Sequence, residues 1–124
     1  MPVTEVRLYR DNKGKVPALD WLRGLPRTVQ EKFNTRIEKL RELGHELRRP
    51  LAAYLRDGIY ELRVKHRHDQ YRMLYFFHRQ EAVILSHGLK KKERKVKDVE
   101  INLAVSNKRK YCSNPEVHTA WLRE

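Results

Sequence analysis

The 124-residue sequence predicts one α+β domain, with an N-terminal strand and helices packed on one face of a mainly antiparallel sheet and a C-terminal helix. Three observations predict this class. Apolar and polar residues alternate near the N-terminus, residues 25–43 carry the apolar spacing of an amphipathic helix, and three strand patterns follow between residues 59 and 89. A chain of this length builds a single core.

The first half of the chain predicts a strand and two helices. Residues 3–9 alternate like a half-buried strand, residues 11–14 form a turn, and residues 16–22 form a short helix with Pro17 near its start. A longer helix over residues 25–43 ends at Gly44. Its core-facing stripe comprises Val29, Phe33, Ile37 and Leu40.

The second half predicts a meander and another helix. A connector over residues 45–55 leads to strands over residues 59–65, 70–78 and 81–89, and then to a basic loop over residues 90–97. Residues 96–110 predict a helix with Val99, Leu103 and Val105 facing inward. We therefore divide the chain into a main domain, residues 1–112, and a C-terminal tail, residues 113–124.

The tail pattern is that of a short final helix beyond the Asn114–Pro115 boundary, over residues 116–124. Val117, Ala120 and Trp121 would share one side of that helix. Such a segment would dock on the domain, join two copies of the chain, or remain unattached to either.

The two strands over residues 59–65 and 70–78 can be aligned through a four-residue loop, which places Lys65 opposite Gln70 and Arg63 opposite Arg72. A register slipped by one residue would mix apolar and charged side chains on each face. In the aligned register one face, expected to lie under the helices, carries Tyr60, Leu62, Val64, Tyr71, Met73 and Tyr75. The other face, expected to be open and charged, carries Glu61, Arg63, Lys65, Gln70 and Arg72.

Arg63 opposite Arg72 is an unusual pair, because like charges across two strands destabilise them. One interpretation is a solvated ion-pair face with Glu61 as the partner. The other is a preformed anion site, since two guanidinium groups match the geometry of a phosphate. The formal net charge of +12 favours the anion site.

This charge, from 28 Lys and Arg against 16 Asp and Glu, predicts a polyanionic partner. Nucleic acid is the first candidate, before an acidic protein or an anionic membrane. The single Cys112 rules out an internal disulfide, and the sequence carries neither a signal-peptide pattern nor an apolar run long enough to span a membrane. We expect a cytoplasmic protein without membrane association.

Several other residues are candidates for chemistry. The basic segment from Lys90 to Lys95 is of the kind that is usually a solvated loop, but here it follows a strand beside the arginine pair. Tyr111 is either an amphipathic residue at a helix end or an aromatic platform for RNA bases. The histidines lack zinc-site spacing, so we expect no metal and no cofactor.

Three segments resemble the RelE/ParE toxin superfamily, and most closely its phage-related HigB-like branch. They read LRDGIYELR (residues 55–63), QYRMLYF (residues 70–76) and LSHGLKKK (residues 85–92), and they are preceded by Arg48-Arg49-Pro50. The resemblance covers roughly residues 3–111, and the three motifs in this order are fairly specific to the branch.

The resemblance implies a RelE-like fold and the toxin of a type II toxin–antitoxin pair. Such a toxin is a ribosome-dependent mRNA endoribonuclease, or mRNA interferase, that inhibits translation without a metal. Its expected partners are the ribosome with its mRNA and a helix-turn-helix antitoxin (HigA-like). Promoter DNA would be bound only through the toxin–antitoxin complex.

The resemblance also implies roles for individual residues. Arg72, Arg63 and Lys91, with Lys90 as the alternative to Lys91, correspond to the basic active-site positions of the family. Glu61 stands where some relatives carry a basic residue. Val96 stands where the family has its late tyrosine, so Tyr111 is a displaced substitute. The expected RNA-binding residues are Lys65, His66, Lys92, Arg94, Lys95 and Tyr111.

The expected chemistry is attack of an RNA 2′-hydroxyl on its own 3′-phosphate, with Arg63 and Arg72 stabilising the charge that develops. Glu61, His66 or a lysine of lowered pKa would move the proton. An Arg72→Ala variant is then expected to lose toxicity and keep its fold. Three alternatives remain: a ParE-like inhibitor of DNA gyrase, a non-catalytic basic RNA-binding module, and an inactivated toxin kept as an interaction protein.

Overall fold

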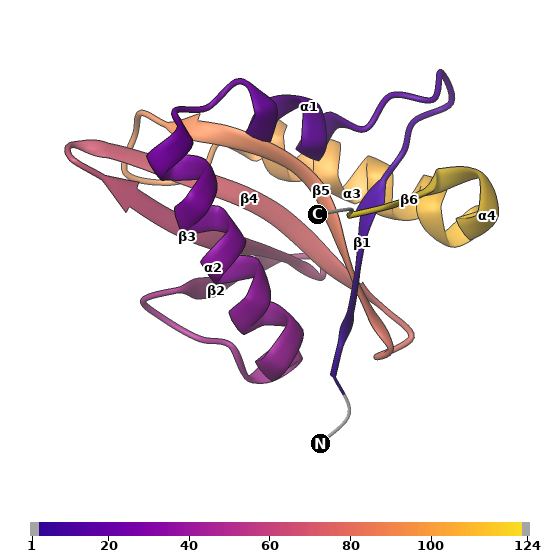
Figure 1. The fold of residues 1–124 in the computed structure, drawn as a ribbon. Coiled ribbons are helices and arrows are strands. Elements are labelled where there is room, and N and C mark those ends of the chain that lie inside the picture. The colour runs from indigo at the N-terminus through magenta and orange to yellow at the C-terminus, as the bar shows by residue number, and fades with distance from the viewer. Residues whose placement is uncertain (1–2, 123–124) are drawn as a thin grey trace.

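One six-stranded sheet organises the computed structural model, which describes residues 3–122 (Figure 1). The strand order is β2-β3-β4-β5-β1-β6, and only the β1–β5 pair is parallel. The strands are β1 (Glu5–Tyr9), β2 (Ala52–Arg56), β3 (Ile59–His66), β4 (Asp69–His78), β5 (Ala82–Lys91) and β6 (Thr119–Trp121). The helices are α1 (Pro17–Arg23), α2 (Arg27–Leu43), the short 3-10 helix η1 (Gly44–Glu46), α3 (Asp98–Ser113) and α4 (Pro115–His118).

The α+β class and the first two helices are confirmed. Helix α2 buries all four residues of the predicted stripe, from Val29 to Leu40. It ends where predicted, because Gly44 has a positive φ of 53° and a Cβ there would lie 2.6 Å from the Thr4 hydroxyl oxygen. Within residues 3–122, no helix combines the length and the apolar character needed to cross a bilayer.

The β3–β4 register is confirmed residue for residue, including Arg63 opposite Arg72. The hairpin is one pair longer than predicted, because His66 also pairs with Asp69. The loop therefore contains two residues, and Arg67 adopts the positive φ of 57° that such a tight turn requires.

The sheet has a core on each face. As Figure 1 shows, α1 and α2 cover one face and α3 lies behind the sheet. The predicted apolar face, including Leu62, Val64 and Met73, packs under α1 and α2. The opposite face is not simply open, which corrects the prediction: Leu74, Phe76 and Ile84 form a second core with α3. The charged residues occupy only the part of this face that α3 leaves uncovered.

The predicted inward stripe of α3 is wrong. Val99 is 68% exposed and Leu103 is 47% exposed, whereas Ile101, Ala104 and Tyr111 are buried against the sheet. Of the predicted residues, Val105 alone packs partly against this core. The two sets lie on different sides of one helix, and the smaller Ala104 allows the closer approach to the sheet.

The helix predicted over residues 116–124 is mostly wrong. Helix α4 ends at His118, and β6 then pairs antiparallel with β1, which gives the free edge of β1 a hydrogen-bonding partner. Ala120 packs against the core, but Val117 and Trp121 are exposed. Residues 123–124 of that prediction lie outside the described part. The tail therefore docks on the sheet.

Two further segments differ from the predictions. The connector over residues 45–55 contains β2, an edge strand whose Ala52-Ala53 start has little β-forming character. Lys90 and Lys91, expected in a loop, are the last two residues of β5. Both differences affect the charged part of the sheet, because β2 and β5 flank the β3–β4 hairpin.

Candidate functional site

Glu61 lies between the two opposed arginines. Its Oε1 accepts a hydrogen bond from Arg72 Nε at 3.0 Å, and its Oε2 lies 3.9 Å from Arg63 Nε. The side chains of Glu61 and Arg72 are 8% and 1% exposed, whereas that of Arg63 is 26% exposed. The carboxylate thus offsets the repulsion between the arginines and leaves Arg63 facing solvent.

Arg72 lies beneath the surface, which corrects the expectation of an open arginine. Its Nη1 donates to the Tyr71 carbonyl oxygen at 3.0 Å and to Gln70 Oε1 at 3.3 Å. Burial lowers the pKa of Arg72, and Arg63 acts in the same direction, while the charge of Glu61 opposes the shift. Arginine stays protonated in proteins, so the group is a fixed buried positive charge.

A pocket of about 400 Å³ lies beside Glu61 and Arg63. We call it the cationic pocket and define it by six of its lining residues, Arg49, Glu61, Arg63, Lys91, Arg94 and Lys95. Arg56 and Asp98 also line it, and they pair with each other at 3.3 Å. The six defining residues therefore supply five cations and one carboxylate, that of Glu61. The cation nearest to Glu61 is Arg72, which is buried and does not line the pocket.

Strand alternation selects Lys91 over Lys90. Gln70 pairs with Lys91 and Tyr71 pairs with Lys90, so Lys91 shares the face of Arg72 while Lys90 lies on the opposite face. There Lys90 Nζ lies 3.3 Å from Asp69 Oδ1 and 5.9 Å from the centre of the Tyr71 ring. Lys90 therefore does not line the cationic pocket.

The environment of Lys91 lowers the pKa of its ammonium group below the ordinary value of 10.5. Partial burial is the largest cause. The positive charges of Arg72, Arg63 and Arg49 act in the same direction, and Glu61 opposes them. A lysine with a lowered pKa beside guanidinium groups can exchange a proton nearer to neutral pH than an ordinary lysine.

The predicted RNA-binding lysines and arginines divide into two groups. Arg94 and Lys95 are exposed and line the cationic pocket, and Lys92 is exposed on the same loop. Lys65 is exposed on the Arg63 face of β3, two residues further toward the hairpin turn. Lys92 and Lys65 therefore extend the positive charge outside the pocket itself.

Neither His66 nor His87 joins the cationic pocket. His66 faces α2, where its Nδ1 lies 3.1 Å from Lys32 Nζ. His87 is buried, with its Nε2 3.2 Å from Glu100 Oε1, and burial lowers its pKa. Among the residues that the structure describes, no three His, Cys, Asp or Glu side chains gather as metal ligands.

Tyr111 does not form an RNA-stacking platform, which corrects that expectation. Its ring is fully buried against Phe76 in the second core. Its hydroxyl accepts a hydrogen bond from Arg7 Nη1 at 2.8 Å and lies 3.1 Å from Thr119 Oγ1. The residue thus joins α3 to β1 and β6, because the amphipathic helix turns it toward the sheet.

We expect Tyr111→Phe to lower the free energy of unfolding by about 1–2 kcal/mol, since it removes a partly buried hydrogen-bond partner of Arg7. Urea denaturation measures this loss. RNA affinity, measured by fluorescence anisotropy, should not change. A loss of RNA affinity at unchanged stability would restore the stacking role.

Arg49 is a pocket residue that was not among the predicted site residues. It follows α2 and η1 and reaches the pocket from the segment before β2, close enough to lower the pKa values of both Arg72 and Lys91. The available signal was the Arg48-Arg49-Pro50 sequence, which belonged to the resemblance but carried no assigned role.

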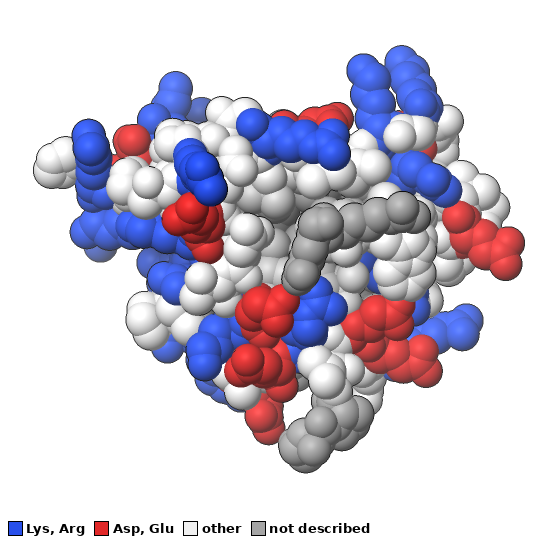
Figure 2. All heavy atoms as spheres, in the orientation of Figure 1, with Lys and Arg blue, Asp and Glu red and all other residues white. Residues whose placement is uncertain are grey.

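The charge of the chain is distributed unevenly. Figure 2 shows the face that carries α1 and α2, where Lys and Arg stand along the left and upper edges and several carboxylates lie across the lower half. Positively and negatively charged side chains are thus mixed on that face. The concentration of cations around the cationic pocket makes it the best anion site among the described residues.

Comparison with known proteins places the chain in a family. No curated protein matches it significantly. The model of the family described as phage-derived protein Gp49-like (DUF891) matches residues 20–109. This range is nearly three quarters of the chain and includes all six residues that define the cationic pocket. The chain therefore belongs to this phage-derived Gp49-like family, which is a RelE-like, toxin-like family.

Proposed function

We propose that this protein is the toxin of a type II toxin–antitoxin pair and cleaves mRNA on the ribosome, with the cationic pocket as its active site. The observation that carries the proposal is the arrangement of Arg49, Arg63 and Lys91 around the Glu61–Arg72 ion pair. Membership of a toxin-like family and the net charge of +12 support it.

In the proposed reaction the 2′-hydroxyl oxygen of the RNA attacks the adjacent phosphorus and the bond to the 5′-oxygen breaks. The products are a 2′,3′-cyclic phosphate and a free 5′-hydroxyl. Arg63 and Arg49, which line the open pocket, hold the phosphate oxygens as negative charge develops on them. The attacking oxygen belongs to the substrate, so the chain needs to supply only charge and proton transfer.

Arg72 is a positioning residue in this mechanism, because its guanidinium is buried and hydrogen-bonded within the protein. It holds Glu61 in place, and Glu61 in turn orients Arg63. Neutral Lys91 accepts the proton of the 2′-hydroxyl and returns it to the departing 5′-oxygen. His66, turned toward α2, takes no part.

Proton transfer by Lys91 would give the cleavage rate a distinctive pH dependence. The neutral amine is the base, so the cleavage rate should rise with pH and level off below 10.5, since the pKa of Lys91 is lowered. Lys91→Arg, which keeps the charge but does not release a proton, should lose both the rate and the rising limb. Single-turnover rates on programmed ribosomes between about pH 6 and about pH 9 measure this.

Lys92→Arg is the matched control, because Lys92 is exposed on the adjoining loop and should retain the rising limb. A Lys91→Arg variant with the wild-type rate and pH slope would assign the proton transfer to another group.

The proposed partners follow from the same function. A helix-turn-helix antitoxin (HigA-like) would neutralise the toxin, and the complex would bind promoter DNA through the antitoxin. An acidic antitoxin segment laid across the cationic pocket would block the substrate phosphate. Purified antitoxin should therefore suppress cleavage at equal molar concentration.

A non-catalytic RNA-binding module is the second candidate. The observation that favours it is the Arg72 guanidinium, whose Nε and Nη1 are both engaged inside the protein. This candidate predicts salt-sensitive binding to many RNAs without cleavage. Primer extension on translated message distinguishes the two, because only the nuclease leaves phased 5′ ends.

A further inference from the structure

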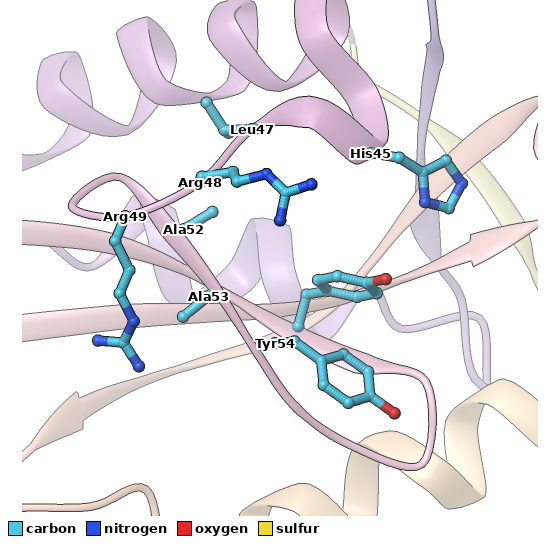
Figure 3. A pocket seen from close by; sticks show the side chains of 8 residues that line it. His45, Leu47, Arg48, Arg49, Ala52, Ala53 and Tyr54 are labelled. Atoms are coloured by element: carbon cyan, nitrogen blue, oxygen red, sulfur yellow. The ribbon is translucent and has the colours of Figure 1, made fainter.

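A second and larger pocket, of about 650 Å³, lies beside the edge strand β2 (Figure 3). Its polar and aromatic lining residues are His45, Arg48, Arg49, Tyr54 and Tyr60. They come from η1, from the segment that precedes β2, and from the paired strands β2 and β3. None of these residues except Arg49 belongs to the cationic pocket's six defining residues.

Aromatic rings form one wall of this pocket. Tyr54 and Tyr60 pair across β2 and β3, with ring centres 5.0 Å apart and an angle of 67° between them. Tyr60 is held from below by Tyr75, stacked at 5.4 Å, and by Phe77 at 5.2 Å. This packing fixes Tyr60 and leaves Tyr54 as the outermost ring of the group.

The Tyr54 ring is both exposed and held in position. It is 56% exposed, and its hydroxyl oxygen accepts a hydrogen bond from the Gly58 backbone amide at 3.1 Å. A large aromatic side chain that stays exposed at a fixed angle offers a flat surface for stacking without a further ordering cost. Tyr54 therefore has the properties of a stacking platform.

The rest of the lining is cationic. None of the acidic side chains in the described part of the chain lines the pocket. Neither Arg48 nor Arg49 forms an ion pair with any carboxylate of residues 3–122. In Figure 3 these adjacent arginines point in different directions, with Arg48 toward the side of Tyr54 and His45 and Arg49 away from them. Two unpaired guanidinium groups beside exposed tyrosine match a ligand with both a π face and negative charge.

The two pockets share part of their lining. Arg49 and Tyr54 line both of them. An extended chain that places a phosphate against Arg49 and Arg63 therefore passes directly beside the Tyr54 ring. Single-stranded RNA has this alternation of phosphate and base, and its unstacked bases are commonly bound on aromatic side chains next to arginine.

We infer that the pocket formed by His45, Arg48, Arg49, Tyr54 and Tyr60 binds an unstacked base of the RNA strand whose phosphate occupies the cationic pocket. The base stacks on Tyr54, and Arg48 contacts its edge or the next phosphate. This inference rests on the proposed RNA substrate and not on cleavage. An acidic peptide is the competing ligand, but it would leave the exposed Tyr54 face without a stacking partner.

Binding of a non-cleavable RNA tests the inference independently of the nuclease proposal. The probe is a fluorescein-labelled 2′-O-methyl hexauridine, and its affinity is measured by fluorescence anisotropy at fixed salt. Tyr54→Ala should weaken binding about tenfold, as expected for the loss of one base–aromatic stack. Tyr54→Phe, which keeps the ring but loses the hydrogen bond from the Gly58 amide, should weaken binding much less than Tyr54→Ala.

The control for general charge is Lys13→Ala, which removes an exposed cation from the turn between β1 and α1. Arg48→Ala should weaken binding more than this control does. Near-ultraviolet circular dichroism and unfolding curves check that each variant is folded.

Hexamers with one abasic site at each position in turn identify the stacked base. At one position the abasic RNA should bind the wild type about tenfold more weakly, and there Tyr54→Ala should cause no further loss. Equal affinities of folded wild type, Tyr54→Ala and Arg48→Ala would overturn the inference. It would also be overturned if a hexaglutamate peptide, and no RNA, bound in a Tyr54-dependent way. RNA binding that depends on Tyr54 without any ribosomal cleavage would retain the pocket and reject only the nuclease.

Discussion

Replacing Arg63 with alanine is expected to lower the rate of ribosome-dependent RNA cleavage about 100- to 1,000-fold, the range for losing one group that stabilises transition-state charge. Arg63 is the arginine of the opposed pair whose side chain reaches the cationic pocket. Its contact with Glu61 is long, at 3.9 Å, so its removal should change the unfolding midpoint little. Single-turnover cleavage and urea denaturation measure the two effects.

Arg63→Lys and Lys13→Ala are the matched controls. The lysine variant keeps the charge but loses the two-pronged geometry, so it should recover only part of the rate. Lys13→Ala removes one exposed positive charge from the turn between β1 and α1 and should cleave like the wild type. If Arg63→Ala and Lys13→Ala cleaved equally well, Arg63 would have no role in the chemistry.

Replacing Arg72 with alanine is expected to lower the free energy of unfolding by about 3 kcal/mol, because it leaves Glu61 as a buried carboxylate without its partner. The sequence alone suggested an exposed Arg72 whose loss would leave the fold intact. Its 1% exposure changes that expectation. Denaturation by urea gives the value, and loss of cleavage by this variant would not by itself prove a role in catalysis.

A double-mutant cycle separates the ion pair from simple packing. Arg72→Met and Glu61→Gln should each destabilise the protein, and the double variant should be less destabilised than the sum, because neither change then leaves a buried charge alone. Strict additivity would mean that the 3.0 Å contact between Glu61 and Arg72 contributes nothing to stability.

The hairpin shows how much of the site could be predicted. Side-chain alternation in residues 59–78 excludes a one-residue slip. With the loop length assumed for the hairpin, the alternation predicted the Arg63–Arg72 pair and its proximity to Glu61. The stripe on α2 was equally readable, because its four buried residues are large and regularly spaced.

The depth of Arg72 could not be read in the same way, since its neighbours Glu61 and Arg49 come from other segments of the chain. The sequence of α3 offers two competing stripes. Val99 and Leu103 are both large apolar residues, but Ile101 and the small Ala104 face the sheet. The buried side also carries Asn107, which gives the helix a weak amphipathic pattern.

The choice between Lys90 and Lys91, and the contribution of Arg49, depended on contacts between distant segments. The β4–β5 pairing shifts register between Leu74 and Tyr75, and a shift of one residue exchanges the faces of Lys90 and Lys91. Arg49 joins the pocket through the path of the segment before β2, which no local pattern specifies.

The most direct test of the central claim is translation in a purified cell-free system, followed by primer extension on the mRNA, with wild type and Arg63→Ala compared. We expect cuts in phase with codons on translated message, no cuts on the same message without ribosomes, and cleavage about 100- to 1,000-fold slower with the variant. Complete, uncut translation at a large excess of folded wild-type protein would contradict the nuclease proposal.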